Sequence, residues 1–229
     1  MSLPSKIKGA LSGQTALRNA IRRVRWWLKY IPGVRNLSIA FDTWYFRGVS
    51  QERPDEHNGV IGDPYFESYA GVLAGKCRNK VLDLGCGHGF LTSRIAQNPA
   101  VTAIVGLDKI NDFRSLDKKI IYQTQDLSQD APLPLGFDTI VSSEFIEHIS
   151  EEAFVKLLAR VSTAIKPDGI FIGSTPKNPT PYKNFSGSKF HIREYNAPDL
   201  KKHLDHFFTK VSVYPVATYC LIWEASGKK

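Results

Sequence analysis

Short apolar runs alternate with longer polar or mixed segments from residue 79 onward, and this alternation limits the fold more than any other feature. Strands that alternate with helices at this spacing form parallel βαβ units. The sequence therefore predicts an α/β fold with a doubly wound, mostly parallel sheet of seven strands. We expect strands at residues 80–84, 101–107, 119–124, 137–142, 169–174, 209–214 and 218–224, and helices at 63–74, 90–97, 150–166 and 196–206.

A glycine-rich turn follows the first predicted strand. The strand leads directly into Gly85, Gly87 and Gly89, which stand at alternate positions before a helix. Glycine is needed where the backbone must approach a ligand closely or take an unusual conformation. Because open α/β sheets bind ligands at the carboxyl ends of their strands, the turn predicts a binding site at this edge.

Two kinds of ligand compete for a glycine turn of this type. A nicotinamide dinucleotide requires G-x-G-x-x-G, so that its pyrophosphate meets the helix N-terminus. Here the spacing is G-x-G-x-G, and Asp83 precedes Gly85 by two residues. A carboxylate at that place repels a pyrophosphate and suits a cationic ligand.

The D-x-G-x-G-x-G stretch resembles the first motif of class I S-adenosylmethionine-dependent methyltransferases. Further motifs follow in the family's order over residues 65–225, including the Pro167-Asp168-Gly169 turn before the fifth strand. The resemblance implies a Rossmann-like methyltransferase fold with S-adenosylmethionine as cofactor. It assigns the ribose hydroxyls to Asp108, the adenine to Asp126 and Leu127, and packing under the cofactor to Cys86. The implied cofactor-binding residues are Asp83, Gly85, Cys86, Gly87, Gly89, Asp108, Lys109, Asp126, Leu127, Ser142 and Ser143.

Three side chains that can bind a metal follow the fourth predicted strand. Glu144, Glu147 and His148 stand at i, i+3 and i+4, so on a helical turn they would share one face. Carboxylate oxygens and an imidazole nitrogen can bind a divalent cation such as Mg²⁺, which would lower the pKa of an acceptor hydroxyl. A helix dipole also favours glutamates at this place without any metal.

The E-x-x-E-H pattern resembles O-methyltransferases of ubiquinone biosynthesis and enzymes that 2′-O-methylate the 3′ end of small RNAs. In the second group a downstream histidine completes a metal site, and the resemblance gives that place to His191 in the loop 176–195. A metal-free general base, His148 or His191 with Glu144 nearby, is one alternative, and a structural role is another. The two histidines of the helix at 196–206 are expected to be solvated.

The net charge of +8 comes from the N-terminal end of the chain. Residues 1–41 contain eight Lys and Arg and no acidic residue, whereas residues 42–229 hold 22 basic and 22 acidic ones. Apolar spacings of three and four within residues 14–31 predict a basic amphipathic helix. Such a helix can bind an anionic membrane surface or RNA, or pack its apolar stripe on the domain. We therefore divide the chain into an arm and loop, 1–62, and a methyltransferase domain, 63–229.

The three cysteines, Cys77, Cys86 and Cys220, lack the spacing of a metal cluster or a disulfide framework. They predict reduced thiols in a cytoplasmic protein. No apolar run reaches the roughly 18–20 residues of a membrane-spanning helix, and no secretory signal follows the basic arm. Peripheral contact with a membrane surface remains open through the arm.

The predicted function is S-adenosylmethionine-dependent O-methylation of a small-molecule, lipid-linked or sugar hydroxyl. An RNA 2′-O-methyltransferase with a divalent metal is the first alternative, although the balanced charge of residues 42–229 shows no basic surface for RNA. A catalytically inactive cofactor-binding protein and a nicotinamide-dependent enzyme are both disfavoured by the Asp83, Asp108 and Asp126 set. Neither the acceptor nor the oligomeric state follows from the sequence.

Overall fold

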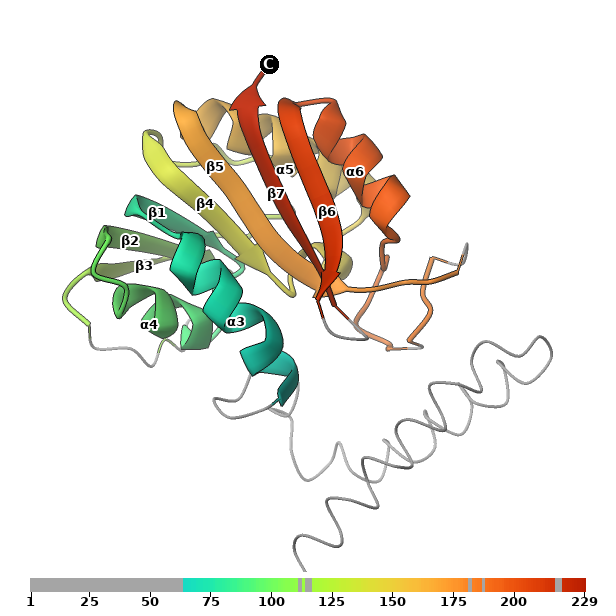
Figure 1. The fold of residues 1–229 in the computed structure, drawn as a ribbon, viewed down its shortest axis with the longest axis horizontal. Coiled ribbons are helices and arrows are strands. Elements are labelled where there is room, and N and C mark those ends of the chain that lie inside the picture. The colour runs from blue at the N-terminus through green and yellow to red at the C-terminus, as the bar shows by residue number, and fades with distance from the viewer. Residues whose placement is uncertain (1–63, 111–112, 114–116, 181–182, 187, 217–219) are drawn as a thin grey trace, which may run out of the picture. The chain divides into compact units, whose positions relative to one another are not determined.

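The computed structural model describes residues 64–110, 113, 117–180, 183–186, 188–216 and 220–229. The predicted arm and loop over residues 1–62, including the helix at 14–31, lie outside the described residues. Figure 1 shows the sheet and its helices. The helical elements are α3 (Pro64–Lys76), α4 (Phe90–Ala96), the 3₁₀ turn η1 (Ile146–His148), α5 (Glu151–Ala164) and α6 (Ala197–Asp205). The strands are β1 (Asn79–Leu84), β2 (Val101–Asp108), β3 (Ile120–Thr124), β4 (Phe137–Ser143), β5 (Ile165–Pro176), β6 (Phe208–Val216) and β7 (Cys220–Lys228).

The seven strands form one sheet in the order β3-β2-β1-β4-β5-β7-β6. Strands β1 to β5 pair in parallel, and β7 runs antiparallel between β5 and β6. The predicted doubly wound, mostly parallel sheet is therefore confirmed, and the antiparallel pair adds its final two strands. Because β1 and β4 are adjacent although β2 and β3 separate them in the chain, the chain reverses its direction of winding at β1. Ligands bind at this place in open α/β sheets.

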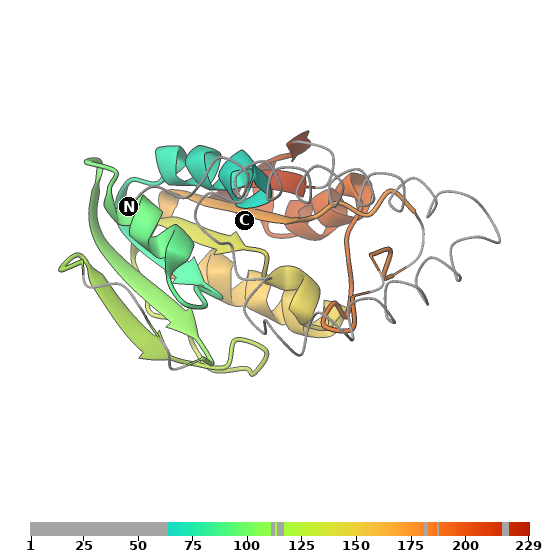
Figure 2. The same ribbon diagram turned by 90° about the horizontal axis from the view of Figure 1, so that it is seen from below.

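Alternate side chains of the strands enter two separate cores. On β1, Leu82 and Leu84 pack with α5 and α6, whereas Val81 packs with α3 and α4. Figure 2 shows α3 and α5 on opposite faces of the sheet. Both clusters consist of buried apolar side chains, so we look for the polar groups of a site at the ends of the strands.

Polar side chains cap the N-terminal ends of α5 and α6. Ser150 accepts a hydrogen bond from the Ala153 amide at 3.1 Å at the start of α5. Asn196 accepts one from the Asp199 amide at 2.8 Å at the start of α6, as the sequence predicts for an N-cap. Within the described residues, no helix is long and apolar enough to cross a membrane.

The fifth strand begins earlier than the sequence predicts. We expected a helix to residue 166, a turn at Pro167-Asp168-Gly169 and a strand from 169, but α5 ends at Ala164 and β5 starts at Ile165. Ile165 already pairs with Phe137, and a register irregularity then precedes the pairing of Ile170 with Thr139. Pairing with β4 therefore makes residues 165–169 part of strand β5, although the local sequence predicts a turn there.

Candidate active site

The glycine turn between β1 and α4 holds three left-handed glycines: φ is 74° at Gly85, 51° at Gly87 and 83° at Gly89. A Cβ at Gly85 would lie 2.4 Å from the Phe145 ring, and one at Gly89 would lie 2.1 Å from the hydroxyl of Tyr122. At Gly87 a Cβ would meet nothing within 4 Å. Two of the glycines are therefore required by the fold, while Gly87 leaves open space that a ligand can approach.

Asp83 lies beneath the turn rather than on its surface. It is 1% exposed, and it accepts a hydrogen bond from the Thr92 hydroxyl at 2.7 Å. Burial, with the nearby charge of Asp108, raises the pKa of Asp83 to about 7 although the Thr92 hydrogen bond opposes the shift. Asp83 thus ties β1 to α4, and its predicted contact with the cofactor stays a prediction.

Asp108, at the end of β2, accepts hydrogen bonds through both carboxylate oxygens. The Gly87 amide donates to one at 2.8 Å, and the Ile110 amide donates to the other at 2.9 Å. Each oxygen retains further acceptor capacity, so a hydroxyl pair can still donate to it. Asp108 therefore braces the glycine turn and presents acceptors beside the open space at Gly87, while the neighbouring Lys109 is exposed.

The third strand end places Asp126 in solvent and Leu127 in the core. The side-chain and backbone donors of Ser128 hold the pKa of Asp126 below its usual value, and the Ser128 hydroxyl lies 2.6 Å from the carboxylate. Arg160 donates to the Leu127 carbonyl at 2.6 Å and fixes this backbone.

Cys86 occupies the turn as a packing residue. Its sulfur would lie 3.0 Å from a Cβ built on Gly106 of β2. Burial, with the charges of Asp83 and Asp108, raises the pKa of the Cys86 thiol, so it remains protonated at neutral pH and is a poor nucleophile.

A chain of hydroxyl groups joins the ends of β4 and β5. The hydroxyls of Ser143 and Ser174 lie 2.9 Å apart, and Ser174 donates to Glu144 at 3.0 Å. Tyr69, reaching in from α3, is hydrogen-bonded to Ser143, and its pKa is raised by burial and by the charge of Glu144. The hydroxyl of Ser142 is buried with no hydrogen-bond partner in the described part of the chain. Nothing in the local sequence of α3 marks Tyr69, since only the packing of α3 on the sheet brings it here.

Glu144 does not share a helical face with Glu147 and His148, and that prediction is wrong. Glu144 has φ of 50°, an uncommon left-handed conformation for a residue other than glycine, and η1 begins two residues later at Ile146. The Glu144 amide donates to the carbonyl of Ser174 at 2.9 Å. Pairing with the end of β5 therefore holds this residue outside the helical turn.

Glu147, His148 and His191 nevertheless come together. One ligand atom from each lies within 4.8 Å of the others. The Glu147 side chain is 1% exposed and accepts a hydrogen bond from Thr175 at 3.0 Å. The two imidazole rings lie edge to face, with centroids 5.1 Å apart. The structure thus assembles one carboxylate and two imidazoles from separate segments, and Glu144 is not among the three.

Burial and neighbouring groups shift the pKa values of the three side chains in this cluster. It raises the pKa of Glu147 to about 7, although His191 and Thr175 oppose the shift. It lowers the pKa of His148. Burial also lowers the pKa of His191, but the hydrogen bond to Glu194 and the charge of Glu147 outweigh it, so the net shift is upward.

The segment between β5 and α6 carries His191, and backbone hydrogen bonds hold this segment against the turn after β4. The amides of Ile192 and Arg193 donate to the Glu147 carbonyl at 2.7 and 3.2 Å. Arg193 also forms an ion pair with Glu151 of α5 at 2.7 Å. The same Glu151 lies 3.1 Å from His203, whose side chain is only 17% exposed, so the expectation that this histidine is solvated is wrong.

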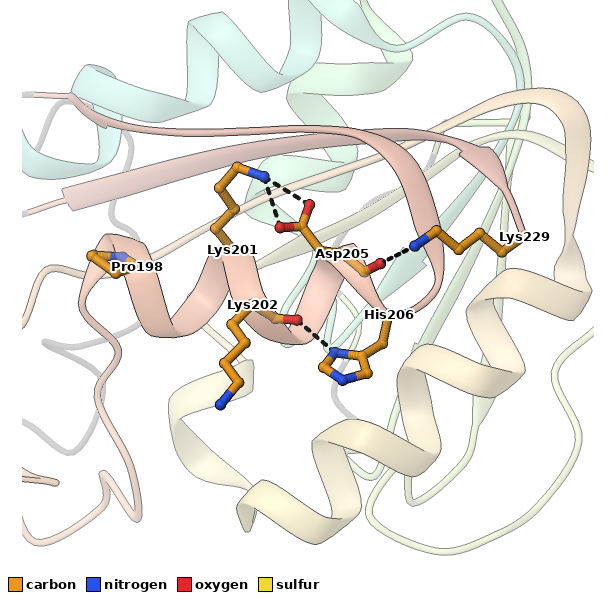
Figure 3. Close-up of a pocket in the computed structure, with 6 residues that line it drawn as sticks. All are labelled: Pro198, Lys201, Lys202, Asp205, His206 and Lys229. Atoms are coloured by element: carbon orange, nitrogen blue, oxygen red, sulfur yellow. Dashed lines mark hydrogen bonds and ion pairs between the residues drawn. The ribbon is translucent and has the colours of Figure 1, made fainter.

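A shallow surface depression lies elsewhere, along α6 and beside Lys229 (Figure 3). Lys201 pairs there with Asp205 at 2.7 Å, and Lys229 donates to the Asp205 carbonyl at 2.5 Å. Lys228, next along the chain, contacts the Ile165 carbonyl at the start of β5. The depression is therefore at the amino end of the parallel strands, opposite the glycine turn.

Comparison with known proteins identifies the class to which this fold and turn belong. Residues 64–228 match the family described as Methyltransferase domain. The chain is therefore a member of the class I S-adenosylmethionine-dependent methyltransferase family. This membership leaves the nicotinamide-dependent alternative without support.

Several curated relatives are named ubiquinone biosynthesis O-methyltransferase. The protein of that name from Aeromonas salmonicida is 27% identical over 153 residues, which cover 63% of this chain and 61% of that protein. The mitochondrial protein from Bos taurus is 32% identical over 117 residues, covering 45% of this chain and 30% of that protein. The chain thus spans from under a third to about three fifths of the length of these relatives.

Solved structures show the same fold. A complex of DhpI with SAH superposes with a TM-score of 0.61 at 19% identity, covering 82% of this chain and 96% of that one. Human N-acetylserotonin methyltransferase in complex with SAM gives a TM-score of 0.59 at 18% identity, covering 70% of this chain and 52% of that one. These likenesses bear on the fold alone.

Proposed function

We propose that this protein is an S-adenosylmethionine-dependent O-methyltransferase whose acceptor is a small-molecule, lipid-linked or sugar hydroxyl. The observation that carries the proposal is the pairing of Asp108 with Gly87, which places a carboxylate beside open space in a glycine turn. The names of the curated relatives support transfer to oxygen.

The residues at the turn fit the cofactor. Gly87 leaves room that a Cβ would fill, Asp108 has acceptor capacity for two ribose hydroxyls, and Ser142 keeps a buried hydroxyl without a partner among the described residues. Asp126 and the Leu127 amide would hold the adenine. When bound, S-adenosylmethionine supplies an electrophilic methyl group on a sulfonium. The chain's own task is then to align an acceptor hydroxyl with that methyl and to manage its proton.

Glu147, His148 and His191 would hold a divalent cation next to the acceptor. The set of one carboxylate oxygen and two imidazole nitrogens suits Zn²⁺ or Fe²⁺ better than Mg²⁺, which prefers oxygen ligands. Glu144, tied to Ser174, would approach as a fourth ligand or act on a nearby proton. Such a cation would lower the pKa of the acceptor hydroxyl.

A metal-free route is the alternative for the same residues. The pKa of His148 is lowered by burial, so its ring is neutral at pH 7 and can accept a proton. In this route His148 or His191 removes the hydroxyl proton directly, with Glu144 nearby.

An RNA acceptor and a membrane-surface acceptor both remain candidates through residues 14–31. Residues 42–229 carry equal numbers of basic and acidic side chains, which favours a small or lipid-linked acceptor over RNA. A protein that binds the cofactor without catalysis is the remaining alternative.

The test is methyl transfer by the full chain from labelled S-adenosylmethionine to catechol, sugar and short RNA acceptors, with and without chelator. We expect transfer to a catechol or another small hydroxyl. Cofactor binding without transfer to any acceptor would favour the inactive alternative. Full activity in excess chelator would exclude the metal route and favour His148 or His191 as the base. A His206→Ala variant is the matched control, since His206 is exposed at the C-terminal end of α6, opposite the glycine turn.

A further inference from the structure

Glu194 is a buried carboxylate close to the candidate site. It is 3% exposed and lies in the segment between β5 and α6. Its Oε2 accepts the backbone amides of Phe185 at 2.7 Å and Ser186 at 2.9 Å. Its Oε1 faces Nδ1 of His191 at 2.6 Å and also accepts the Ser186 hydroxyl. One carboxylate therefore receives four donors from a single loop.

These donors determine the protonation pattern of the His191 ring. Because an ionised carboxylate can only accept, the short contact requires the proton of His191 to be on Nδ1. In the neutral ring Nε2 then keeps its lone pair and is the nitrogen available to Glu147 and His148. The other three contacts of this carboxyl group, from the Phe185 and Ser186 amides and the Ser186 hydroxyl, also use it as an acceptor.

We propose that Glu194 is a positioning residue that holds His191 as its Nδ1–H tautomer, so that Nε2 serves as a donor beside Glu147 and His148. The inference rests on the proposed function for the use of that nitrogen, but the tautomer can be measured without catalysis. His148 reaches the same tautomer by another contact, because its Nδ1 donates to the Phe190 carbonyl at 2.9 Å. Both rings thus offer Nε2, as ligation by a histidine oriented through its second nitrogen requires.

The substitution Glu194→Gln tests this arrangement with almost no change in size. The backbone amides of Phe185 and Ser186 are fixed donors, so the glutamine oxygen must take the place of Oε2. Its NH₂ group then replaces Oε1 and faces His191. An NH₂ group donates, so Nδ1 must accept and the ring proton must move to Nε2.

The tautomer is read from nitrogen chemical shifts of the ¹⁵N-labelled full chain, with the His191 signals assigned by their loss in His191→Gln. At a pH above the pKa of His191, where the ring is neutral, we expect Nδ1–H in the wild type and Nε2–H in Glu194→Gln. Glu152→Gln is the control because Glu152 is exposed on α5 and pairs with Lys156 of the same helix, and it should leave the tautomer unchanged. Nε2–H in the wild type, or an unchanged tautomer in a folded Glu194→Gln, would overturn the proposal.

Calorimetric titration with Zn²⁺ alone gives a second readout. We expect Glu194→Gln to bind Zn²⁺ 10–100-fold more weakly than the wild type, the usual effect of losing a partner that orients a ligand, while Glu152→Gln binds normally. Equal Zn²⁺ affinities in wild type and Glu194→Gln would contradict the proposal. If the wild type binds no Zn²⁺, the metal route of the proposed function loses its support, and the tautomer measurement still decides the role of Glu194.

Discussion

Nδ1 of His148 lies 2.9 Å from the carbonyl oxygen of Phe190, and this hydrogen bond connects the two segments that build the candidate site. A carbonyl can only accept, so the proton of the ring is on Nδ1. The Ile192 amide returns a hydrogen bond to the Glu147 carbonyl at 2.7 Å. The turn after β4 and the loop after β5 therefore hold one another, and the cluster exists only while that loop is docked.

The first prediction concerns the ion pair that docks the loop. Glu151→Ala removes the closer of two acidic partners of Arg193, whose side chain is only 16% exposed, and the partner of the largely buried His203. We expect a loss of roughly 1–2 kcal/mol in the free energy of unfolding, because a largely buried guanidinium loses its closest charged acceptor and keeps only the longer contact with Asp199 at 3.9 Å. Urea unfolding measures it. Glu152→Ala, which removes an exposed pair with Lys156, should cause no measurable change; equal effects of the two variants would contradict the prediction.

Substitution by alanine should have different effects on stability and cofactor binding at Gly87 and at Gly89. Gly89→Ala places a Cβ on the Tyr122 hydroxyl at a left-handed position, so we expect at least about 2 kcal/mol of destabilisation. Gly87→Ala meets no atom within 4 Å, so its cost is only the left-handed strain of roughly 1 kcal/mol. Its main effect should be on S-adenosylhomocysteine binding, since the new methyl fills the open space. Thermal unfolding and calorimetry separate the two effects, and unaltered binding by Gly87→Ala would contradict the cofactor placement.

Asp108→Asn should weaken cofactor binding strongly. The amide NH₂ group would face one of two backbone donors, from Gly87 or Ile110, and one acceptor for the ribose would be lost. We expect S-adenosylhomocysteine to bind at least about tenfold more weakly, since an unsatisfied buried donor costs roughly 1–3 kcal/mol. Isothermal calorimetry measures this, with the exposed Asp130→Asn as the control. Equal affinity in the wild type and Asp108→Asn would show that this strand end does not hold the ribose.

Asp83 should make stability depend on pH. Its pKa in the fold is about 7, above the ordinary value for aspartate, so the folded chain binds a proton that the unfolded chain releases from about pH 4. The stability contributed by the protonated group is therefore present at low pH and is lost as pH rises through 7. The unfolding free energy of the wild type, minus that of Asp83→Asn, should fall by about 2 kcal/mol between pH 5 and pH 7. Denaturation curves at both pH values test this, and a constant difference would contradict it.

The cofactor half of the site could be predicted because its residues act through local backbone chemistry. Gly85, Gly87 and Gly89 are marked by their spacing, and the strand-end positions of Asp108 and Asp126 follow from the βαβ pattern. Parallel strands bring their carboxyl ends to one edge, so one-dimensional order is enough to place these groups together.

The acceptor half could be predicted only in part. Glu147 and His148 are neighbours in sequence, but His191 lies more than forty residues further along the chain. It meets them only because backbone hydrogen bonds hold its loop against the turn after β4. Glu144 does not lie on the helical turn that we expected, because its amide donates to the Ser174 carbonyl at the end of β5. Tyr69 carries no local signal, since it meets Ser143 only through the packing of α3 on the sheet. Glu194 lies only three residues from His191, but no regular element in this loop predicts their contact.

The sequence by itself determined the class of fold, the glycine turn and the order of the acidic residues that follow it. Periodic apolar runs and glycine positions impose these through local geometry and burial. Only the tertiary structure decided which side chains share the space beyond the turn. It buried Asp83 and Glu147, placed His191 beside Glu147, and hydrogen-bonded the Phe190 carbonyl to His148. The physical reason is that desolvation and hydrogen bonding between distant segments depend on packing, which a one-dimensional pattern does not contain.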